Sequence, residues 1–275
     1  MNKLSTQKRI QVVAALVEGS GINSASRMTG VGKPTILRLL ASLGTACMEY
    51  QDRSLRNLTC KRIQVDEIWS FCFAKDRNLP DELKEKFGFG SVWTWMAIDA
   101  DTKLIPCWLV GDRDATYANK FISDLASRLA NRVQLTSDGH RPYLEAIEGA
   151  FGNEIDYSML VKLYNNPPTG NQTRYSPGVC CGIKKSKIVG NPDGRHVSTS
   201  YSERFNLQLR MSQRRFTRLV NGHSKKVENH IHSIAMYTMY YNFARIHQTL
   251  RVTPAMAAGV SDHVWSLEEM INLIN

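Results

Sequence analysis

The N-terminal part of the chain carries the hydrophobic spacing of three short helices. Apolar residues recur every three or four positions over 7–18 and again over 34–43. A shorter helix is expected over 24–28, followed by a glycine turn at 29–32. Helix, short helix, glycine turn and helix is the order of a helix-turn-helix unit, so residues 1–50 are predicted to form a small all-α domain of this kind.

After a polar connector, with 51–62 as the expected linker, the pattern changes to the alternation of strands. Residues 61–73 (KRIQVDEIWSFCF) alternate and are rich in β-branched and aromatic side chains, and 91–111 resembles two strands joined by a turn. The following segments predict helix, strand, helix and strand, at 115–130, 132–139, 141–151 and 154–164. This order predicts an α/β fold with an RNase H-like mixed sheet and flanking helices.

The C-terminal third begins with a segment rich in breakers of regular structure. Residues 165–200 hold four of the nine prolines, which predicts a long loop or insertion. Helices are expected from about residue 201 and again over 227–246. The catalytic domain is therefore predicted to span 63–260, with a tail at 261–275.

The charge of the chain favours a polyanionic partner. Its 275 residues carry a formal net charge of +10 and a pI of about 9.4. Residues 1–62 have ten basic and three acidic side chains, and 204–226 have seven basic side chains and no acid. Basic segments on both sides of a carboxylate-bearing middle suit an enzyme that holds nucleic acid.

The sequence shows no signal for a membrane or for export. No apolar run approaches the ~20 residues that cross a bilayer, and residues 1–20 lack the apolar core of a signal peptide. The six cysteines contain no CxxC pair, so reduced thiols are expected. These features predict a cytoplasmic protein, associated with the nucleoid if its partner is DNA.

Three acidic residues are the best candidates for chemistry. Asp66 lies in the first predicted strand and Asp138 ends the fourth, and these strands are neighbours in an RNase H-like sheet. Glu203 follows in a helix that can pack beside them. Hard divalent cations take oxygen ligands, and paired cations can activate an attacking oxygen and stabilise a leaving one. The trio therefore predicts a site for two Mg²⁺ or Mn²⁺ ions.

Other acids are weaker candidates on geometric grounds. Glu67 follows Asp66 in a strand and is expected to point to the opposite face. Asp99 and Asp101 sit at a predicted turn, where aspartate is common. Asp156, in the fifth strand, is the strongest rival. The acids of the following helix are expected to be solvated, namely Glu145 and Glu148.

The sequence around these three acids resembles that of a known family. The segments VDEIWSF (65–71), GDRDAT (111–116), TSDGHRPY (136–143) and SERFNLQLRMSQRRFTRLV (202–220) resemble transposases of the insertion-sequence-one-like family of DDE enzymes. The tail YYNFARIHQTLRVTPAMAAGV (240–260) resembles a C-terminal block of related insertion-sequence transposases. The chain departs from the pattern in its longer 165–200 segment, in Ile246, and in lacking an N-terminal cysteine finger.

The resemblance implies a DNA transposase that nicks DNA and joins the freed 3′-OH to target DNA. Asp66, Asp138 and Glu203 would then be the metal ligands and catalytic residues, with His140 and Asn206 as possible auxiliaries. Double-stranded DNA, both element ends and target, would be the partner of a homo-oligomer. Four basic residues would meet DNA phosphates, namely Arg204, Arg210, Arg214 and Arg215.

The predicted third helix supplies further candidates for DNA binding. Lys33, Thr35 and Arg38 fall on its exposed side, able to meet phosphates or base edges. The alternative is an ordinary three-helix cap without a DNA-binding role.

Three other functions compete with transposition. The chain could be a DNA-binding regulator, inactive or domesticated, or an RNase H-like nuclease that cuts without joining. His230 and His232 match the two-histidine motif of tyrosine-dependent nicking enzymes, with Tyr240 or Tyr241 as nucleophile. Histidines two apart on a helix point about 200° away from each other, so this reading is disfavoured.

Overall fold

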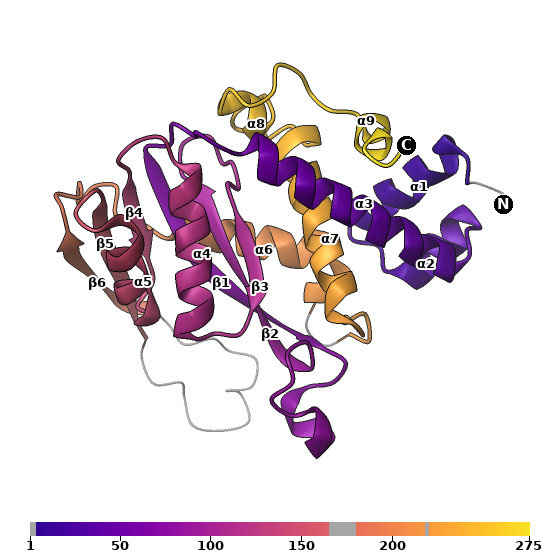
Figure 1. Ribbon diagram of the computed structural model, residues 1–275, viewed down its shortest axis with the longest axis horizontal. Coiled ribbons are helices and arrows are strands. Elements are labelled where there is room, and N and C mark those ends of the chain that lie inside the picture. Colours follow the sequence, from indigo (N-terminus) through magenta and orange to yellow (C-terminus); the bar gives the residue numbers. More distant parts are fainter. Residues whose placement is uncertain (1–3, 165–179, 218–219) are drawn as a thin grey trace.

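The computed structural model describes residues 4–164, 180–217 and 220–275 and contains a mixed sheet with helices on both faces (Figure 1). The described strands form one sheet in the order β3-β2-β1-β4-β5-β6. β1 pairs in parallel with β4 and β4 with β5, whereas β2, β3 and β6 are antiparallel to their neighbours. The strands are β1 (Arg62–Cys72), β2 (Gly90–Asp99), β3 (Trp108–Gly111), β4 (Gln134–Ser137), β5 (Asp156–Tyr164) and β6 (Cys180–Val189). The first five have the RNase H-like arrangement that the sequence predicted.

Helices cover the two faces of this sheet. α4 (Ala115–Arg128) and α5 (Pro142–Phe151) lie together on one face, where the buried Trp95 ring meets Phe121 and Tyr143 at centroid distances of 6.0 and 5.5 Å. α6 (Ser200–Ser212) packs against β1 and β2 on the other face. β1 is thus covered on both sides, which explains its nearly continuous burial.

The N-terminal helices are α1 (Thr6–Val17), α2 (Ile22–Thr29) and α3 (Lys33–Ser54). Gly30 ends α2 in the left-handed region at φ 71°, which glycine adopts without strain. α3 runs eleven residues further than predicted, so the start of the predicted linker at 51–62 is helical. Its second half is amphipathic, because Cys47 and Gln51 are buried and the Gln51 amide donates to the Ala235 carbonyl at 3.1 Å.

This helical unit does not stand apart from the sheet. α3 lies along α7 (Val227–Met239), and α1 contacts α9 (Leu267–Asn272) in the predicted tail (Figure 1). Gly44 permits the closest approach, since a Cβ there would lie 2.5 Å from Cβ of His232. The Arg9 guanidinium also donates to Asn275 at 2.8 Å. The buried apolar side chains of helices and sheet form one continuous core.

The predicted insertion at 165–200 is partly a strand. β6 pairs antiparallel with β5, whereas residues 165–179 lie outside the described part of the chain. The prolines of 165–200 predict a loop, and β6 gives no opposing signal, because it is exposed or half-buried along its whole length and shows no alternation of apolar and polar positions. An edge strand without a buried face gives no hydrophobic signal.

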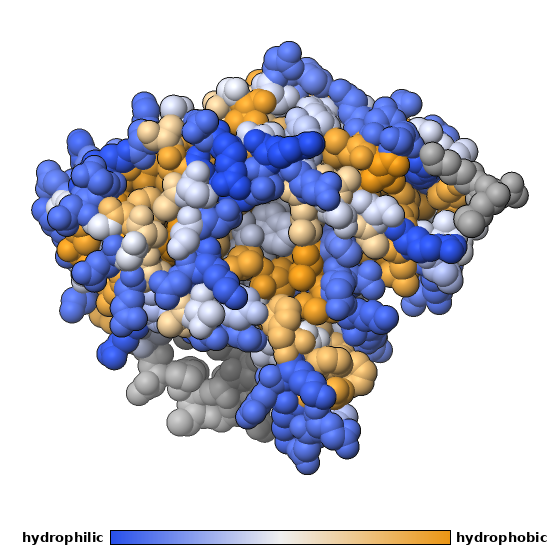
Figure 2. Space-filling view, in the orientation of Figure 1, coloured by the Kyte–Doolittle hydropathy of each residue, from blue (hydrophilic) through white to orange (hydrophobic). Residues whose placement is uncertain are grey.

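The remaining elements are short. α7 continues into a π-helical turn at Tyr240–Ala244, which accounts for the helix predicted to residue 246, and α8 spans Pro254–Ala257. Single 3-10 turns lie at Asp76–Asn78, Asp81–Leu83 and Arg214–Phe216. Figure 2 shows a hollow with hydrophobic residues at its bottom between α4 and the pair α3 and α7. Among the described residues, no helix is both long and apolar enough to cross a membrane.

Candidate active site

The register of the sheet brings two of the predicted acids together. Gln64 of β1 pairs with Thr136 of β4 in parallel. Asp66 and Asp138 each lie two residues further along, so Asp66 in the middle of β1 lies beside Asp138, which directly follows β4. The Asp138 carboxylate accepts a hydrogen bond from the backbone amide of His140 at 2.9 Å, which fixes the loop after β4.

Gln64 also positions the third predicted acid. Its side-chain oxygen accepts hydrogen bonds from the backbone amides of Tyr201 and Ser202 at 2.8 and 3.1 Å. These bonds fasten the first turn of α6 to β1, one residue before Glu203. On the next turn, Asn206 donates from its amide nitrogen to Asp66 at 2.8 Å. α6 is therefore held directly over Asp66.

All three predicted acids line one cavity of about 790 Å³. Asp66, Asp138 and Glu203 come from segments far apart in the sequence, as expected for a site assembled by the fold. Basic side chains line the same cavity, namely Arg113, Arg141, Lys162 and the imidazole of His140. The cavity therefore offers oxygen ligands for a cation next to positive groups that suit a phosphate.

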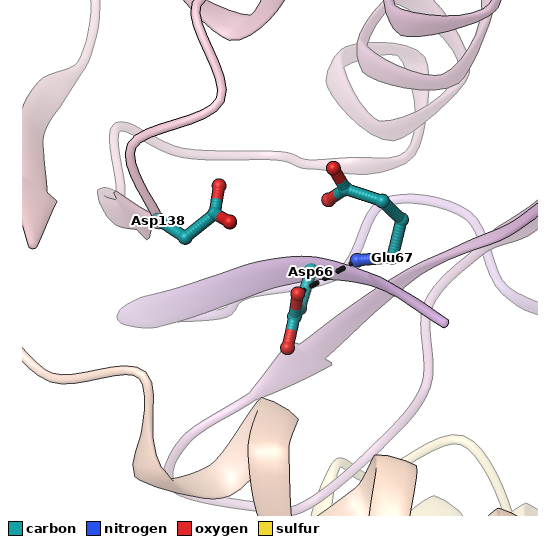
Figure 3. A group of neighbouring side chains, drawn as sticks. All are labelled: Asp66, Glu67 and Asp138. Atoms are coloured by element: carbon teal, nitrogen blue, oxygen red, sulfur yellow. Dashed lines mark hydrogen bonds between the residues drawn. The ribbon is translucent and has the colours of Figure 1, made fainter. Parts of the chain in front are cut away.

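Glu67 belongs to this site, although its strand position placed it on the opposite face. Asp66 and Glu67 do leave β1 on opposite sides (Figure 3). However, one carboxylate oxygen from each of Asp66, Glu67 and Asp138 lies within 4.8 Å of the other two. The Glu67 side chain stays on its own side of β1 and bends toward Asp138, so the three carboxylates gather around the strand (Figure 3). Such a carboxylate cluster fits a divalent cation with oxygen ligands.

Glu67 is held by groups on the α4 and α5 face. Its side chain is only 1% exposed, and it accepts hydrogen bonds from Arg113 at 2.7 Å and from the Tyr143 hydroxyl at 3.1 Å. Arg113 also lies over the Trp93 ring, 5.0 Å from its centroid. Burial raises the pKa of Glu67, and the nearby Asp138 adds to this, whereas the Arg113 charge opposes it.

Asp66 is the most perturbed acid of the cluster. Its pKa is raised to about 7, first by burial and then by the negative charges of Glu67 and Asp138. A backbone hydrogen bond from the Glu67 amide at 2.8 Å favours the ionised form but does not cancel these effects. A divalent cation among these carboxylates would remove the repulsion that raises this pKa.

His140, a possible auxiliary residue in the sequence, lies beside the cluster. Its ring is tilted against Trp95 and edge-on to Tyr143, and its Nε2 lies 3.9 Å from the Glu67 carboxylate. Burial and the Arg113 charge lower the pKa of His140, so the ring is neutral at pH 7. Its Nε2 is buried without a hydrogen-bond partner among the described residues.

Glu203 has a basic partner from β5 that the sequence analysis did not identify. Lys162 donates to both Glu203 carboxylate oxygens at 2.5 Å, and the Thr199 hydroxyl donates to one of them at 2.6 Å. Lys162 lies in the strand next to Asp138's strand, a placement that only the sheet order reveals.

The basic residues predicted to meet phosphates divide into two groups. Arg204 and Arg214 are exposed, and Arg210 is half-buried on the face of α6 that carries Glu203. Arg215 points inward, donates to the Ser224 hydroxyl at 3.1 Å and has a pKa lowered to about 10 by burial. Its position suits a structural role better than a phosphate contact.

The predicted DNA-contacting residues of α3 lie at its start. Lys33 and Arg38 are exposed and Thr35 is half-buried, and Arg38 donates to the Thr35 hydroxyl at 3.3 Å. All three lie in the first two turns of α3, next to the turn that joins it to α2.

The rival acids have other roles in the fold. Asp156 starts β5 at the opposite end of the sheet, where it pairs with Arg132 at 2.8 Å. Asp99 caps its turn by accepting hydrogen bonds from Asp101 and Thr102. The helix after Asp138 exposes its acids, as predicted for Glu145 and Glu148.

His230 and His232 do not share a site. His230 is fully buried between the hydroxyls of Ser70 and Ser224, at 3.2 and 2.9 Å, and burial lowers its pKa to about 3. His232 instead faces α3, with Nε2 3.4 Å from the Thr45 hydroxyl. The two-histidine nicking mechanism is therefore excluded by geometry.

No protein-family model matches the chain, and no curated protein matches it. A piggyBac transposase synaptic complex with hairpin DNA is similar over 99% of this chain and 72% of that chain, at 10% identity and a TM-score of 0.43. The Mos1 strand transfer complex is similar over 54% of this chain and 57% of that chain, at 11% identity and a TM-score of 0.23. A pre-cleavage Mos1 transpososome is similar over 57% of this chain and 60% of that chain, at 10% identity and a TM-score of 0.22. These similarities are too low to indicate what this chain does.

Proposed function

We propose that the protein is a DNA transposase that cuts and joins DNA strands by metal-assisted phosphoryl transfer. One observation carries the proposal: Asp66, Asp138 and Glu203 line a single cavity although they are separated by more than sixty residues at each step. Three acids that converge from β1, β4 and α6 are the arrangement that the resemblance to DDE transposases implies for this chain.

We expect the acids of this cavity to hold a pair of divalent cations. Asp66, Asp138 and Glu203 would hold Mg²⁺ or Mn²⁺, with Asp66 and Asp138 contributing the closely spaced oxygens. The cations would supply charge stabilisation at the phosphorus centre during cleavage and joining. Asn206 would orient the Asp66 carboxylate through its 2.8 Å hydrogen bond, and Glu67 would add negative charge to the cluster.

Other side chains of the cavity would bind the DNA backbone. Arg113, Arg141 and Lys162 line it and can meet phosphate oxygens beside the acids. The start of α3 would contact the duplex through Lys33 and Arg38, which are exposed. Arg38→Ala in the full chain is expected to weaken duplex binding by about one phosphate contact, measured as the salt dependence of affinity.

The test of the proposal is Asp138→Asn, assayed on DNA that carries the element's ends. The amide is nearly isosteric but lacks the anionic oxygen, so strand cleavage and joining with Mg²⁺ or Mn²⁺ should fall by at least about 100-fold, while gel-shift binding persists. Glu145→Gln removes an exposed acid of the neighbouring helix and should leave both activities unchanged.

Each alternative function has its own outcome in this assay. Binding without cleavage by the wild-type chain would identify a DNA-binding regulator. Cleavage without joining would identify an RNase H-like nuclease. If Asp138→Asn cuts as well as the wild type, the acidic cavity is not the catalytic site.

A further inference from the structure

A second cavity lies between the N-terminal helices and the segment that follows α6. Its volume is about 480 Å³, and it is formed by the start of α2, the residues after α6 and the start of α7. It is separate from the acidic cavity, since the two share no lining residue.

The lining of this cavity is positively charged. Arg27, Arg214, Arg215 and Lys225 line it, and no aspartate or glutamate of the described residues does so. Across the described ranges 4–164, 180–217 and 220–275, none of Arg27, Arg214 and Lys225 forms an ion pair. Positive charges gathered in a cavity without counter-charges repel one another, and an anion would relieve this repulsion.

The start of α2 adds donors to the same cavity. Gly21, Ile22, Asn23 and Ser24 line it, and no side chain in the described part of the chain caps the first turn of α2. The first backbone amides of a helix have no partner within the helix and carry partial positive charge. Together with the basic side chains they form a setting for a phosphate group.

Arg214 is held in the cavity by two glycines. A Cβ on Gly222 would lie 2.8 Å from Cγ of Arg214 and 3.4 Å from its Nε, and a Cβ on Gly21 would lie 3.4 Å from the same Cγ. The arginine stem therefore passes between two backbone segments that lack side chains. This packing restricts the stem of Arg214 before any ligand binds, which lowers the entropy cost of binding.

The cavity also joins the N-terminal helices to the helix that carries Glu203. Gln213 ends α6, and its side chain donates to the Leu16 carbonyl at 3.3 Å and accepts from the Ser233 hydroxyl at 2.7 Å. Gly19 closes the same junction, since a Cβ there would lie 3.0 Å from the Met211 carbonyl oxygen. An anion bound here would contact both parts of the protein.

We propose that this cavity binds one phosphodiester of the DNA backbone, held jointly by the start of α2, Arg214 and Lys225. The inference rests on the proposed DNA-binding function, but not on the identity of the catalytic acids. A phosphodiester is favoured over a free phosphate because the exposed Arg214, Asn221 and Lys225 open the cavity to the surface, where a polymer can reach it.

The experiment measures duplex binding by the full chain as a function of salt, using fluorescence anisotropy. Arg214→Gln should make the slope of log affinity against log salt shallower by about 0.9, which corresponds to one phosphate contact. Between 50 and 200 mM salt, the fold loss of affinity of this variant should therefore be roughly one third of the loss of the wild type. Gly222→Ala should change the slope in the same direction, because the added Cβ displaces the Arg214 stem. Lys120→Gln removes an exposed charge on α4 and should produce no change beyond experimental error.

A second arm titrates the same proteins with inorganic phosphate by calorimetry. If Arg214→Gln abolishes phosphate binding but leaves the DNA slope intact, the cavity serves a free anion and the proposal is overturned. An unchanged slope in a folded Arg214→Gln protein, with normal wild-type binding, also overturns it. Loss of wild-type DNA binding at low salt would instead remove the proposed function, and this inference with it. Thermal melts verify that each variant is folded.

Discussion

Lys162 and Glu203, which both line the acidic cavity, form an ion pair in which the lysine nitrogen lies 2.5 Å from each carboxylate oxygen. The pair links β5 to α6, next to the strand that ends in Asp138. Without a metal, the ammonium thus neutralises the acid that is proposed to hold a cation. A cation and Lys162 compete for the same two oxygens.

This competition predicts that Lys162→Gln binds Mn²⁺ more tightly than the wild type. Both partners are partly exposed, so the ion pair contributes at most about 1 kcal/mol, or roughly a fivefold gain in affinity. Calorimetric titration of the full chain measures the change, with Lys120→Gln as the control. Weaker Mn²⁺ binding by Lys162→Gln would mean that the ammonium supports the site instead of competing for it.

A second prediction concerns the pH dependence of metal binding. The pKa of Asp66 is about 7, so below this pH a cation must displace a proton from the cluster. Mn²⁺ affinity should therefore rise as pH increases from 6 to 8. Asp138→Asn removes one of the charges that raise the Asp66 pKa, and should shift the midpoint of this rise to lower pH. A flat affinity profile between pH 6 and 8 would contradict the assignment.

The same shift affects stability without metal. The folded pKa of Asp66 lies above its unfolded value near 3.9, so the folded state binds more protons between pH ~4 and 7. Stability should fall as pH rises through this window. Asp66→Asn removes this penalty and should raise the free energy of unfolding at pH 8 by about 1 kcal/mol or more, which raises the Tm by roughly 2–4 °C. Asn206 can turn its amide to match the new partner, because its oxygen has no hydrogen bond among the described residues.

A third prediction concerns the buried carboxylate of Glu67. Arg113→Met leaves this nearly inaccessible carboxylate without its cationic partner and should destabilise the fold by about 2 kcal/mol. In the Glu67→Gln background the same change should cost much less, because no buried charge is left unpaired. Urea denaturation of the four proteins at pH 7 gives the coupling energy directly. Equal costs in both backgrounds would show that Arg113 acts through packing on Trp93 alone.

A fourth prediction concerns the junction of α3 and α7. Gly44→Ala would bring a Cβ within 2.7 Å of Cα of His232, which forces backbone to move, and should destabilise the fold by about 1–3 kcal/mol. Gly149→Ala is the matched control on α5, where a Cβ meets nothing within 4 Å. That variant should gain roughly 0.5–1 kcal/mol from the better helix propensity of alanine. If Gly44→Ala melts at the wild-type temperature, the two helices are not packed as described.

The sequence predicts the sheet well because its signals are local and periodic. The alternation over β1, the turn at Asp99 and the helix patterns of α4 and α5 each determine one element, and parallel β1–β4 pairing then follows from the order. Asp66 and Asp138 were predicted to meet for this reason, and the register confirms it.

The features that could not be predicted from the sequence depend on contacts between distant segments. Glu67 leaves β1 on the side opposite to Asp66 but bends toward Asp138, which a rule about the direction of Cβ cannot foresee. Lys162 has a partner 41 residues away in the chain. The second half of α3 resembles a connector in sequence, because its buried positions, Cys47 and Gln51 among them, stand among polar residues and are covered by segments distant in the chain, chiefly α7.

The close approach at Gly44 would also fix the spacing along DNA between the proposed α3 contact and the site of cleavage. α3 exposes Lys33 and Arg38 at one end and is packed against α7 near its middle, within the continuous core that also supports the acidic cavity. If α3 holds a duplex as proposed, the distance between that contact and the acids would be fixed by the protein, because both lie on one continuous core. Each base pair inserted between the two contacts turns the helix by roughly 35°, so one or two insertions would present the wrong face of the duplex to the acids.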